Sequence, residues 1–175
     1  MEKIFSCLFI SFFISVGAIS QNASTAGNSE ENQKDKISGM ILNWHAAAGD
    51  ANFDAYFSYI APDGIFIGTD PTENWVKPEF EKWAKPYFES GKTWDFKTLK
   101  RNVFLSEDAN FAWFDELLET HMGLCRGSGV VRKIDGEWKV QHYVLSISIP
   151  NEDVDEVSGM KKDFDKKLID QLKSE

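Results

Sequence analysis

His142 is the side chain best placed for proton transfer, because it shares alternate positions of an apolar run with Trp138, Val140, Val144 and Ser146. Side chains of a β-strand alternate between its two faces, so these five residues are predicted to share one face. An imidazole on that face could accept a proton or orient a ligand near neutral pH. The alternative is a structural histidine that a backbone or carboxylate partner satisfies.

Asp115 is the second candidate for proton transfer. It lies two residues after Trp113, so both are predicted on one face of a strand. A carboxylate beside an indole in a pocket would have a raised pKa, which suits proton abstraction. Glu116 points to the opposite face, and apolar residues on both faces leave open which carboxylate is internal. The alternative is an outward carboxylate paired with Arg or Lys on the next strand.

Three further polar residues are candidates for ligand contacts. Arg126 and Ser128 share a face of the following strand, where Arg126 could pair with Asp115 or hold an anionic ligand group. Asp70 lies in a polar loop, residues 68–74, and is either a turn residue or a charged gate at the mouth of a pocket.

Aromatic residues are abundant, with six Trp and 14 Phe. Many must be ordinary core residues, but some could line a cavity for a flat apolar ligand. The candidates for this lining are Trp44, Tyr56, Phe66, Trp83 and Trp113. The three histidines have no zinc-binding spacing, and we expect neither a metal nor a cofactor.

The elements that position these residues are helices followed by strands. Helical spacing predicts one helix near residues 31–48, a short one after Asp50, and a third opened by Pro78. A short strand at 65–67 precedes the third helix. Four later runs read as strands joined by short turns, which makes neighbours antiparallel. They span residues 94–105, 111–120, 122–134 and 137–149. The pattern predicts an α+β domain with helices on one face of the sheet.

The ends of the chain are predicted to lie outside this domain. Residues 1–20 combine an apolar run with small residues before position 21, as in a signal peptide. Residues 21–33 are polar and predicted to be a disordered leader. The domain would span residues 34–151, and residues 152–175 would form a polar C-terminal helix. The protein is therefore expected to be exported, to a periplasm or to the medium.

The charge of the chain limits its partners. The formal net charge is −9 and stays so after residues 1–20 are removed, because that segment carries one acidic and one basic residue. This balance disfavours nucleic acid and anionic membrane surfaces. We expect no membrane association after cleavage. Only Cys125 would remain, so no internal disulfide is expected.

Several segments together resemble the SnoaL-like branch of the nuclear transport factor 2-like superfamily, roughly over residues 36–151. They read APDGIFIGTD, WAKPYF, AWFDE, RGSGV and GEWKV, the last running into His142. The resemblance implies a cone of three N-terminal helices packed on a strongly curved antiparallel sheet around an apolar cavity. It also implies a homodimer through the outer face of the sheet. Many relatives carry a second histidine where this chain has Val144, which disfavours a metal site or two-histidine relay.

Three functions follow from this reading. The first is binding of a small apolar or aromatic molecule in the cone, with Asp115, Arg126 and His142 as polar contacts. The second is a cofactor-independent isomerase, cyclase or dehydratase in which Asp115 or His142 removes a proton beside a carbonyl. The third is a non-catalytic dimeric assembly module whose own side chains fill the cavity.

Overall fold

The computed structural model describes the backbone of residues 18–175 and the side chains from Ser29 onward. Most of the predicted signal peptide, residues 1–17, lies outside the described residues. The elements in chain order are α1 (Ala18–Gly49), α2 (Phe53–Ser58), β1 (Ile60–Ile67), β2 (Asn74–Val76), α3 (Lys77–Glu89), β3 (Lys97–Leu105), β4 (Phe111–Thr120), β5 (Gly123–Ile134), β6 (Glu137–Ile147), η1 (Asn151–Asp153) and α4 (Val154–Leu172).

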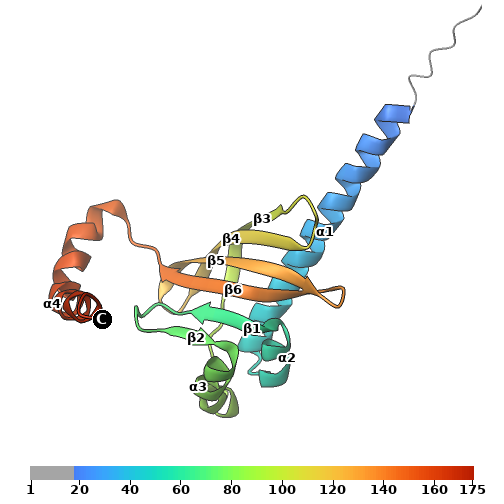
Figure 1. Cartoon of the computed structure of the whole chain (residues 1–175). Helices are drawn as coiled ribbons and strands as arrows, with labels where there is room; N and C mark the ends of the chain where they lie inside the picture. The colour runs from blue at the N-terminus through green and yellow to red at the C-terminus, as the bar shows by residue number, and fades with distance from the viewer. Residues whose placement is uncertain (1–17) are drawn as a thin grey trace, which may run out of the picture.

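The six strands form one curved, unclosed sheet in the order β2-β1-β6-β5-β4-β3 (Figure 1). Strands β3 to β6 form the predicted antiparallel meander. Asp135 and Gly136 both have positive φ angles in the β5–β6 turn, as a tight hairpin requires. The expectation of a purely antiparallel sheet is wrong, because β1 pairs with β6 in parallel. Between β1 and β6 the chain forms β2, α3 and the strands β3 to β5. Strand β6 then lies beside β1.

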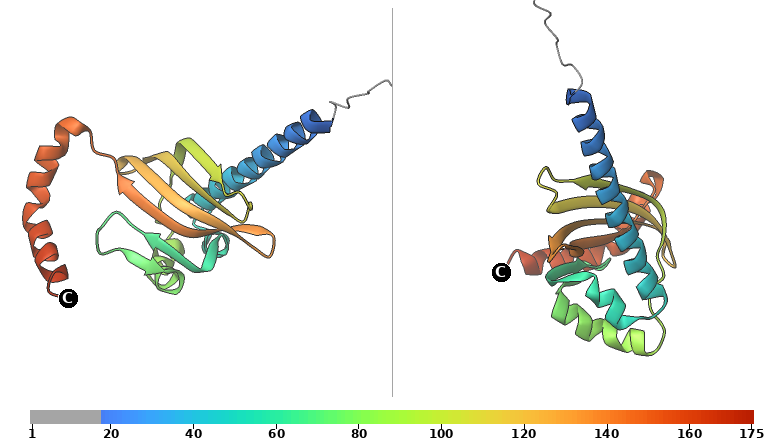
Figure 2. Two further views of the ribbon diagram at one scale, coloured as in Figure 1. Left: turned by 45° about the horizontal axis from the view of Figure 1, so that its top comes forward. Right: turned by 90° about the vertical axis from the view of Figure 1, so that its right-hand side faces the viewer.

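The helices differ from the expected arrangement in two respects. The resemblance implies three N-terminal helices, but α3 follows the β1–β2 hairpin, as the order of the predicted strand and helix indicated. α1 begins at Ala18, so residues 21–33 are helical where their composition predicts a disordered leader. An ion pair between Glu30 and Lys34, one helical turn apart, stabilises this polar part of α1. Figure 2 shows α1 running along the sheet, with its polar first turns extending beyond it.

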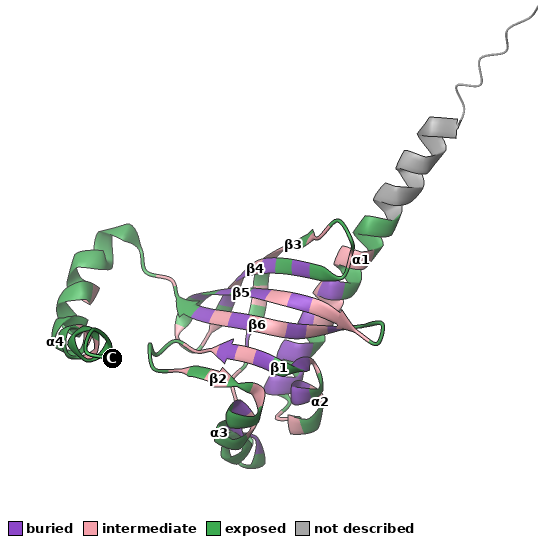
Figure 3. Ribbon diagram, viewed as in Figure 1, coloured by how far each residue is buried: buried purple, intermediate pink, exposed green. Residues whose placement is uncertain are grey.

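The core lies between the sheet and the three helices α1, α2 and α3 (Figure 3). α1 contributes a buried stripe at helical spacing that consists of Ile37, Ile41, Trp44 and Ala48. The C-terminal helix α4 stands apart from this core, and none of its residues is buried. No helix within residues 18–175 is long and apolar enough to cross a membrane.

A β-bulge in β6 decides which side chains of this strand face the core. Val130 on β5 pairs with His142, but the next residue, Val131, pairs with Val140, so Gln141 is an extra residue. Before the bulge, Val140 is buried, and after it the buried position passes to Tyr143. The prediction that five alternating residues of this strand share one face is therefore wrong.

We expect Gly129→Ala to lower the free energy of unfolding by about 1–3 kcal/mol, because overpacking forces neighbouring atoms apart. A β-carbon at Gly129 would lie 2.7 Å from the backbone oxygen of His142 and 2.7 Å from the Phe114 ring. Urea denaturation measures the change. Ser128→Ala is the control, because Ser128 is exposed on the opposite face of the same strand. Equal stabilities of the two variants would contradict the close packing at Gly129.

Candidate functional site

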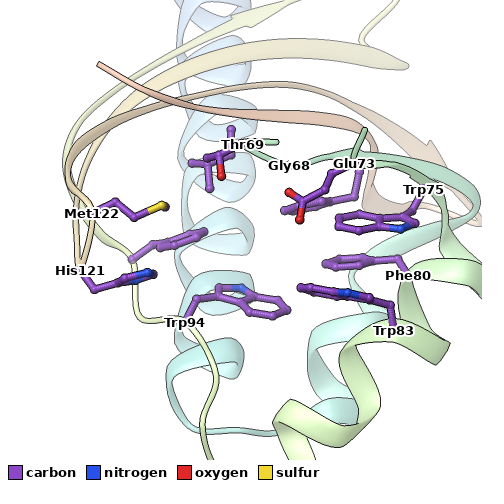
Figure 4. Close-up of a pocket in the computed structure, with 12 residues that line it drawn as sticks. Gly68, Thr69, Glu73, Trp75, Phe80, Trp83, Trp94, His121 and Met122 are labelled. Carbon is purple, nitrogen blue, oxygen red and sulfur yellow. The ribbon is translucent and has the colours of Figure 1, made fainter. Parts of the chain in front are cut away.

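A pocket of about 210 Å³ opens at the end of the core between the β1–β2 loop, α3 and the β4–β5 turn. Figure 4 shows that flat aromatic rings make up much of its wall. Trp83 is 39% exposed, so the pocket communicates with solvent. The lining residues are Phe66, Gly68, Thr69, Glu73, Trp75, Phe80, Trp83, Trp94, Phe96, His121, Met122 and Leu145.

The aromatic rings of the pocket are nearly parallel. Phe80 and Trp83 lie three residues apart on α3, which brings them to one face of the helix. Trp75 stacks on both, with ring centroids 5.4 Å from Phe80 and 4.7 Å from Trp83. Trp94 lies 5.8 Å from Phe80 at an interplanar angle of 18°. A planar ligand ring inserted beside them can adopt the same orientation.

Glu73 is the carboxylate of the pocket wall, and the β1–β2 loop fixes its position. The backbone N–H of Gly68 donates to the carbonyl oxygen of Glu73 at 3.0 Å, which closes the loop. The backbone N–H of Asp70 donates to Oε2 of Glu73 at 3.3 Å. Figure 4 shows this carboxylate above the stacked rings, with His121 and Met122 on the other side of the pocket.

A second polar group lies deeper, where Glu116 is almost completely buried. Its Oε1 accepts hydrogen bonds from His45 Nε2 at 2.7 Å and from the Tyr143 hydroxyl at 2.9 Å. Its Oε2 accepts from Arg101 Nε at 3.0 Å and from Arg101 Nη2 at 2.7 Å. Both carboxylate oxygens therefore have two short partners.

The electrostatics of this cluster keep Glu116 ionised at neutral pH. Burial by itself raises the pKa of Glu116, but the hydrogen bonds and charges of His45 and Arg101 outweigh burial and lower it. An ionised carboxylate can only accept hydrogen bonds, so His45 Nε2 carries the proton that it shares with Glu116. Burial and the neighbouring Glu116 charge raise the pKa of Tyr143 well above its usual value, so its hydroxyl stays a donor.

The cluster joins α1 to the sheet rather than lining the pocket. Arg101 Nη1 donates to the backbone oxygen of Ser38 on α1 at 2.8 Å. His45 belongs to the same helix, one turn beyond the buried Ile41. Because every oxygen of Glu116 is occupied and the side chain is shielded from the pocket, we assign it to stability and not to proton transfer.

Residues 37–150 match the model of the SnoaL-like domain, which is more than half of the chain. The chain belongs to the SnoaL-like family. A comparison with curated proteins finds no match.

Solved structures share the fold of this SnoaL-like domain. An NTF2-like protein of unknown function from Pseudomonas putida is 16% identical, with a TM-score of 0.58 over 68% of this chain and 89% of that one. An NTF2-like protein from Cytophaga hutchinsonii is 16% identical, with a TM-score of 0.55 over 66% and 98%. A protein with a cystatin-like fold from Nostoc punctiforme is 15% identical, with a TM-score of 0.53 over 66% and 90%. Identities this low establish the fold alone.

The two residues predicted for proton transfer do not face the interior of the SnoaL-like domain. On β4, Phe114 and Glu116 are buried, so Asp115 lies on the outer face and accepts a hydrogen bond from Asn102 Nδ2 at 2.9 Å. His142 lies on the same outer face because of the bulge at Gln141. The sequence left open which of Asp115 and Glu116 faces inward, and the structure places Glu116 there. The prediction that His142 shares the face of Trp138 and Val140 is wrong.

The predicted ligand contacts divide into four groups. Phe66 and Trp83 lie in the pocket wall, and their role in binding stays a prediction. Trp44 and Tyr56 are buried core residues whose rings stack 5.4 Å apart. Asp70 is an exposed turn residue beside the pocket, and bonds from Thr72 lower its pKa. The remaining three lie on the outer face of the sheet: Trp113, Arg126 and Ser128.

The sequence interpretation considered Glu116 but missed the other polar residues of both sites. It assigned no role to His45, Glu73, Arg101 or His121. A signal for one pair is present, because Arg101 and Glu116 are equally distant from the β3–β4 turn and hence opposite each other. Opposite charges at facing positions indicate an ion pair. No comparable pattern indicates Glu73, whose orientation depends on the fold of its loop.

We expect Glu116→Gln to lower the free energy of unfolding by about 3–5 kcal/mol at neutral pH, because Arg101 would stay buried without its partner. The pKa of Glu116 is lowered by folding, so its contribution is complete above the ordinary value of 4.5 and is lost as the pH falls through the lower folded pKa. The acid-induced loss of stability should therefore be smaller in the variant than in the wild type. Urea denaturation between pH 7 and pH 3 measures both effects.

Asp115→Asn is the matched control for this prediction, because it removes the neighbouring carboxylate on the outer face of the same strand. We expect a change of about 1 kcal/mol or less, as for one partly exposed hydrogen bond. If the free energy of unfolding of Glu116→Gln falls between pH 7 and pH 3 by as much as that of the wild type, the assignment of the ionised carboxylate to Glu116 is contradicted.

Proposed function

We propose that this SnoaL-like domain binds one small, planar and largely apolar molecule in the pocket of Figure 4. The observation that carries this proposal is the near-parallel arrangement of four rings, those of Trp75, Phe80, Trp83 and Trp94. Their interplanar angles lie between 11° and 29°. Aromatic groups stack favourably in offset parallel geometry, so a ligand ring would extend an existing stack.

The size of the pocket limits the ligand. Its volume is about 210 Å³, and a cavity of about 150 Å³ holds one benzene ring. The pocket therefore suits one ring with a small substituent, or two fused rings. A steroid-sized skeleton would need the β1–β2 loop or α3 to move.

Binding is a better account of this pocket than proton transfer by Asp115 or His142. Both residues lie on the outer face of the sheet, away from the pocket. The inward carboxylate Glu116 has its hydrogen-bonding positions filled by His45, Arg101 and Tyr143. The polar groups of the pocket wall are then positioned to orient a bound molecule.

We expect Trp83→Leu to weaken binding of indole by roughly ten-fold, because one stacking partner is removed and base-like rings gain about 1–3 kcal/mol from such contacts. Isothermal titration calorimetry measures the affinity. Trp113→Leu is the control, since Trp113 is 51% exposed on the outer face of the sheet. Equal weakening by both variants, or indole binding by neither variant nor wild type, would contradict the proposed pocket.

We also propose that the protein is exported and forms a homodimer through the outer face of the sheet. The apolar residues 4–16 support export, and cleavage after Ser20 would leave the buried stripe of α1 intact. Exposed Trp113 and Phe104, stacked 5.7 Å apart on the outer face, support the dimer. Large exposed apolar groups on one face are typical of protein interfaces.

Native mass spectrometry of the protein from the exported fraction tests both statements. We expect a dimer whose chains begin near Gln21. Trp113→Lys should shift the protein to monomers, because a charge would have to be buried in the interface. Glu79→Lys is the control, at an exposed position on α3 rather than on the sheet. Monomeric wild-type protein contradicts the dimer, and a retained N-terminal segment contradicts cleavage.

A further inference from the structure

The charged groups around the aromatic pocket are predominantly acidic. Glu73 lies in the pocket wall, and the lining side chains described from Ser29 onward include neither Lys nor Arg. The hollow that adjoins the pocket at His121 contains Asp95 and Glu119, and its described basic side chains are Lys97 and His121. On the opposite side, exposed Asp70 belongs to the same loop as Glu73. A ligand that enters this pocket therefore passes carboxylates.

Glu73 is poorly satisfied by the protein itself. Its carboxylate accepts one long hydrogen bond, 3.3 Å from the backbone N–H of Asp70. The ion pairs formed by side chains from Ser29 onward do not include it. The side chain is only partly exposed and lies against aromatic rings. Loss of solvation around a charged group is costly unless a partner of opposite charge replaces water.

Aromatic rings supply a second attraction for positive charge. Each ring has a negative electrostatic face, and a cation within about 6 Å of a ring centroid is attracted to it, most strongly for Trp. Trp75, Trp83 and Trp94 all line this pocket. Centroids of Trp75 and Trp83 are 4.7 Å apart, and those of Trp83 and Trp94 are 6.3 Å apart. A cation in the pocket is therefore close to more than one indole.

We propose that the ligand of this pocket is a small organic cation, an aryl ammonium or a cationic heteroaromatic ring. Glu73 neutralises its charge and the three tryptophans contact its apolar part. The inference rests on the proposed binding function and adds the charge of the ligand to it. It also explains why a carboxylate is held inside an otherwise aromatic wall, because a neutral hydrocarbon would leave that carboxylate unpaired.

Gly68 is part of this arrangement. A β-carbon at Gly68 would lie 2.0 Å from Oε2 of Glu73, which is shorter than any tolerated contact. The carboxylate of Glu73 thus folds back over Gly68 and needs a residue without a side chain there. Gly68→Ala would keep the negative charge but displace it, since the flexible end of Glu73 can move.

Phenyltrimethylammonium and tert-butylbenzene form a matched pair of probes, because they have the same shape and differ in one positive charge. We expect the wild-type protein to bind the cation at least ten-fold more tightly by isothermal titration calorimetry. Glu73→Gln should weaken cation binding by roughly ten-fold or more, as expected for loss of a charge-assisted contact, and should leave binding of the neutral probe within about two-fold. Gly68→Ala should weaken cation binding in the same direction.

Glu79→Gln is the control for Glu73→Gln, because it removes one negative charge from an exposed position on α3. It should change the affinity for the cation by less than two-fold. Circular dichroism spectra of the variants confirm that each is folded.

The possible outcomes separate the two proposals. Equal affinity for cation and neutral probe, or an unchanged cation affinity in Glu73→Gln, overturns the cationic ligand and leaves the aromatic pocket in place. Tighter binding of benzoate than of the cation also overturns it and assigns charge recognition to His121. If none of these probes nor indole binds to the folded wild-type protein, both proposals fail.

Discussion

The buried Glu116 carboxylate is the constraint on which the rest of this fold depends. One ion links three separate parts of the chain: α1 through His45, β3 through Arg101, and β6 through Tyr143. A charge in the core is tolerated only when its partners are all in place, so the cluster couples helix docking to strand pairing. The bonds are directional, and they fix α1 along its axis in a way that the apolar stripe alone would not.

The aromatic pocket adjoins this cluster through Phe96. Phe96 lines the pocket on one side and contacts the His45 ring edge-on, with centroids 5.7 Å apart. Phe96 thus lies between the buried cluster and the pocket. This separation assigns different tasks to the two groups of polar residues: Glu116 and its partners hold the fold, and Glu73 faces the solvent-accessible site.

Much of the fold was predictable, because the meander of β3 to β6 follows from local turn residues and apolar runs. The parallel pairing of β1 with β6 was not, since it joins segments far apart in the chain. The prediction of the site residue His142 was wrong for a local reason. A strict alternation placed His142 inside, and one bulged residue, Gln141, reversed its orientation. Asp115 and Glu116 were symmetric alternatives in the sequence, and only the partners Arg101 and His45, on other elements, distinguish them.

The bulge also bears on how the length of this strand can change during evolution. Gln141 divides β6 into two halves with opposite phase, and each half is held by its own neighbours. Loss of Gln141 would leave Trp138, Val140, Tyr143 and Leu145 facing inward, now in one regular alternation. An uninterrupted strand lacks this tolerance, because a single insertion moves every side chain on one side of it to the opposite face of the sheet. Related domains can therefore differ by one residue here and still keep the same interior.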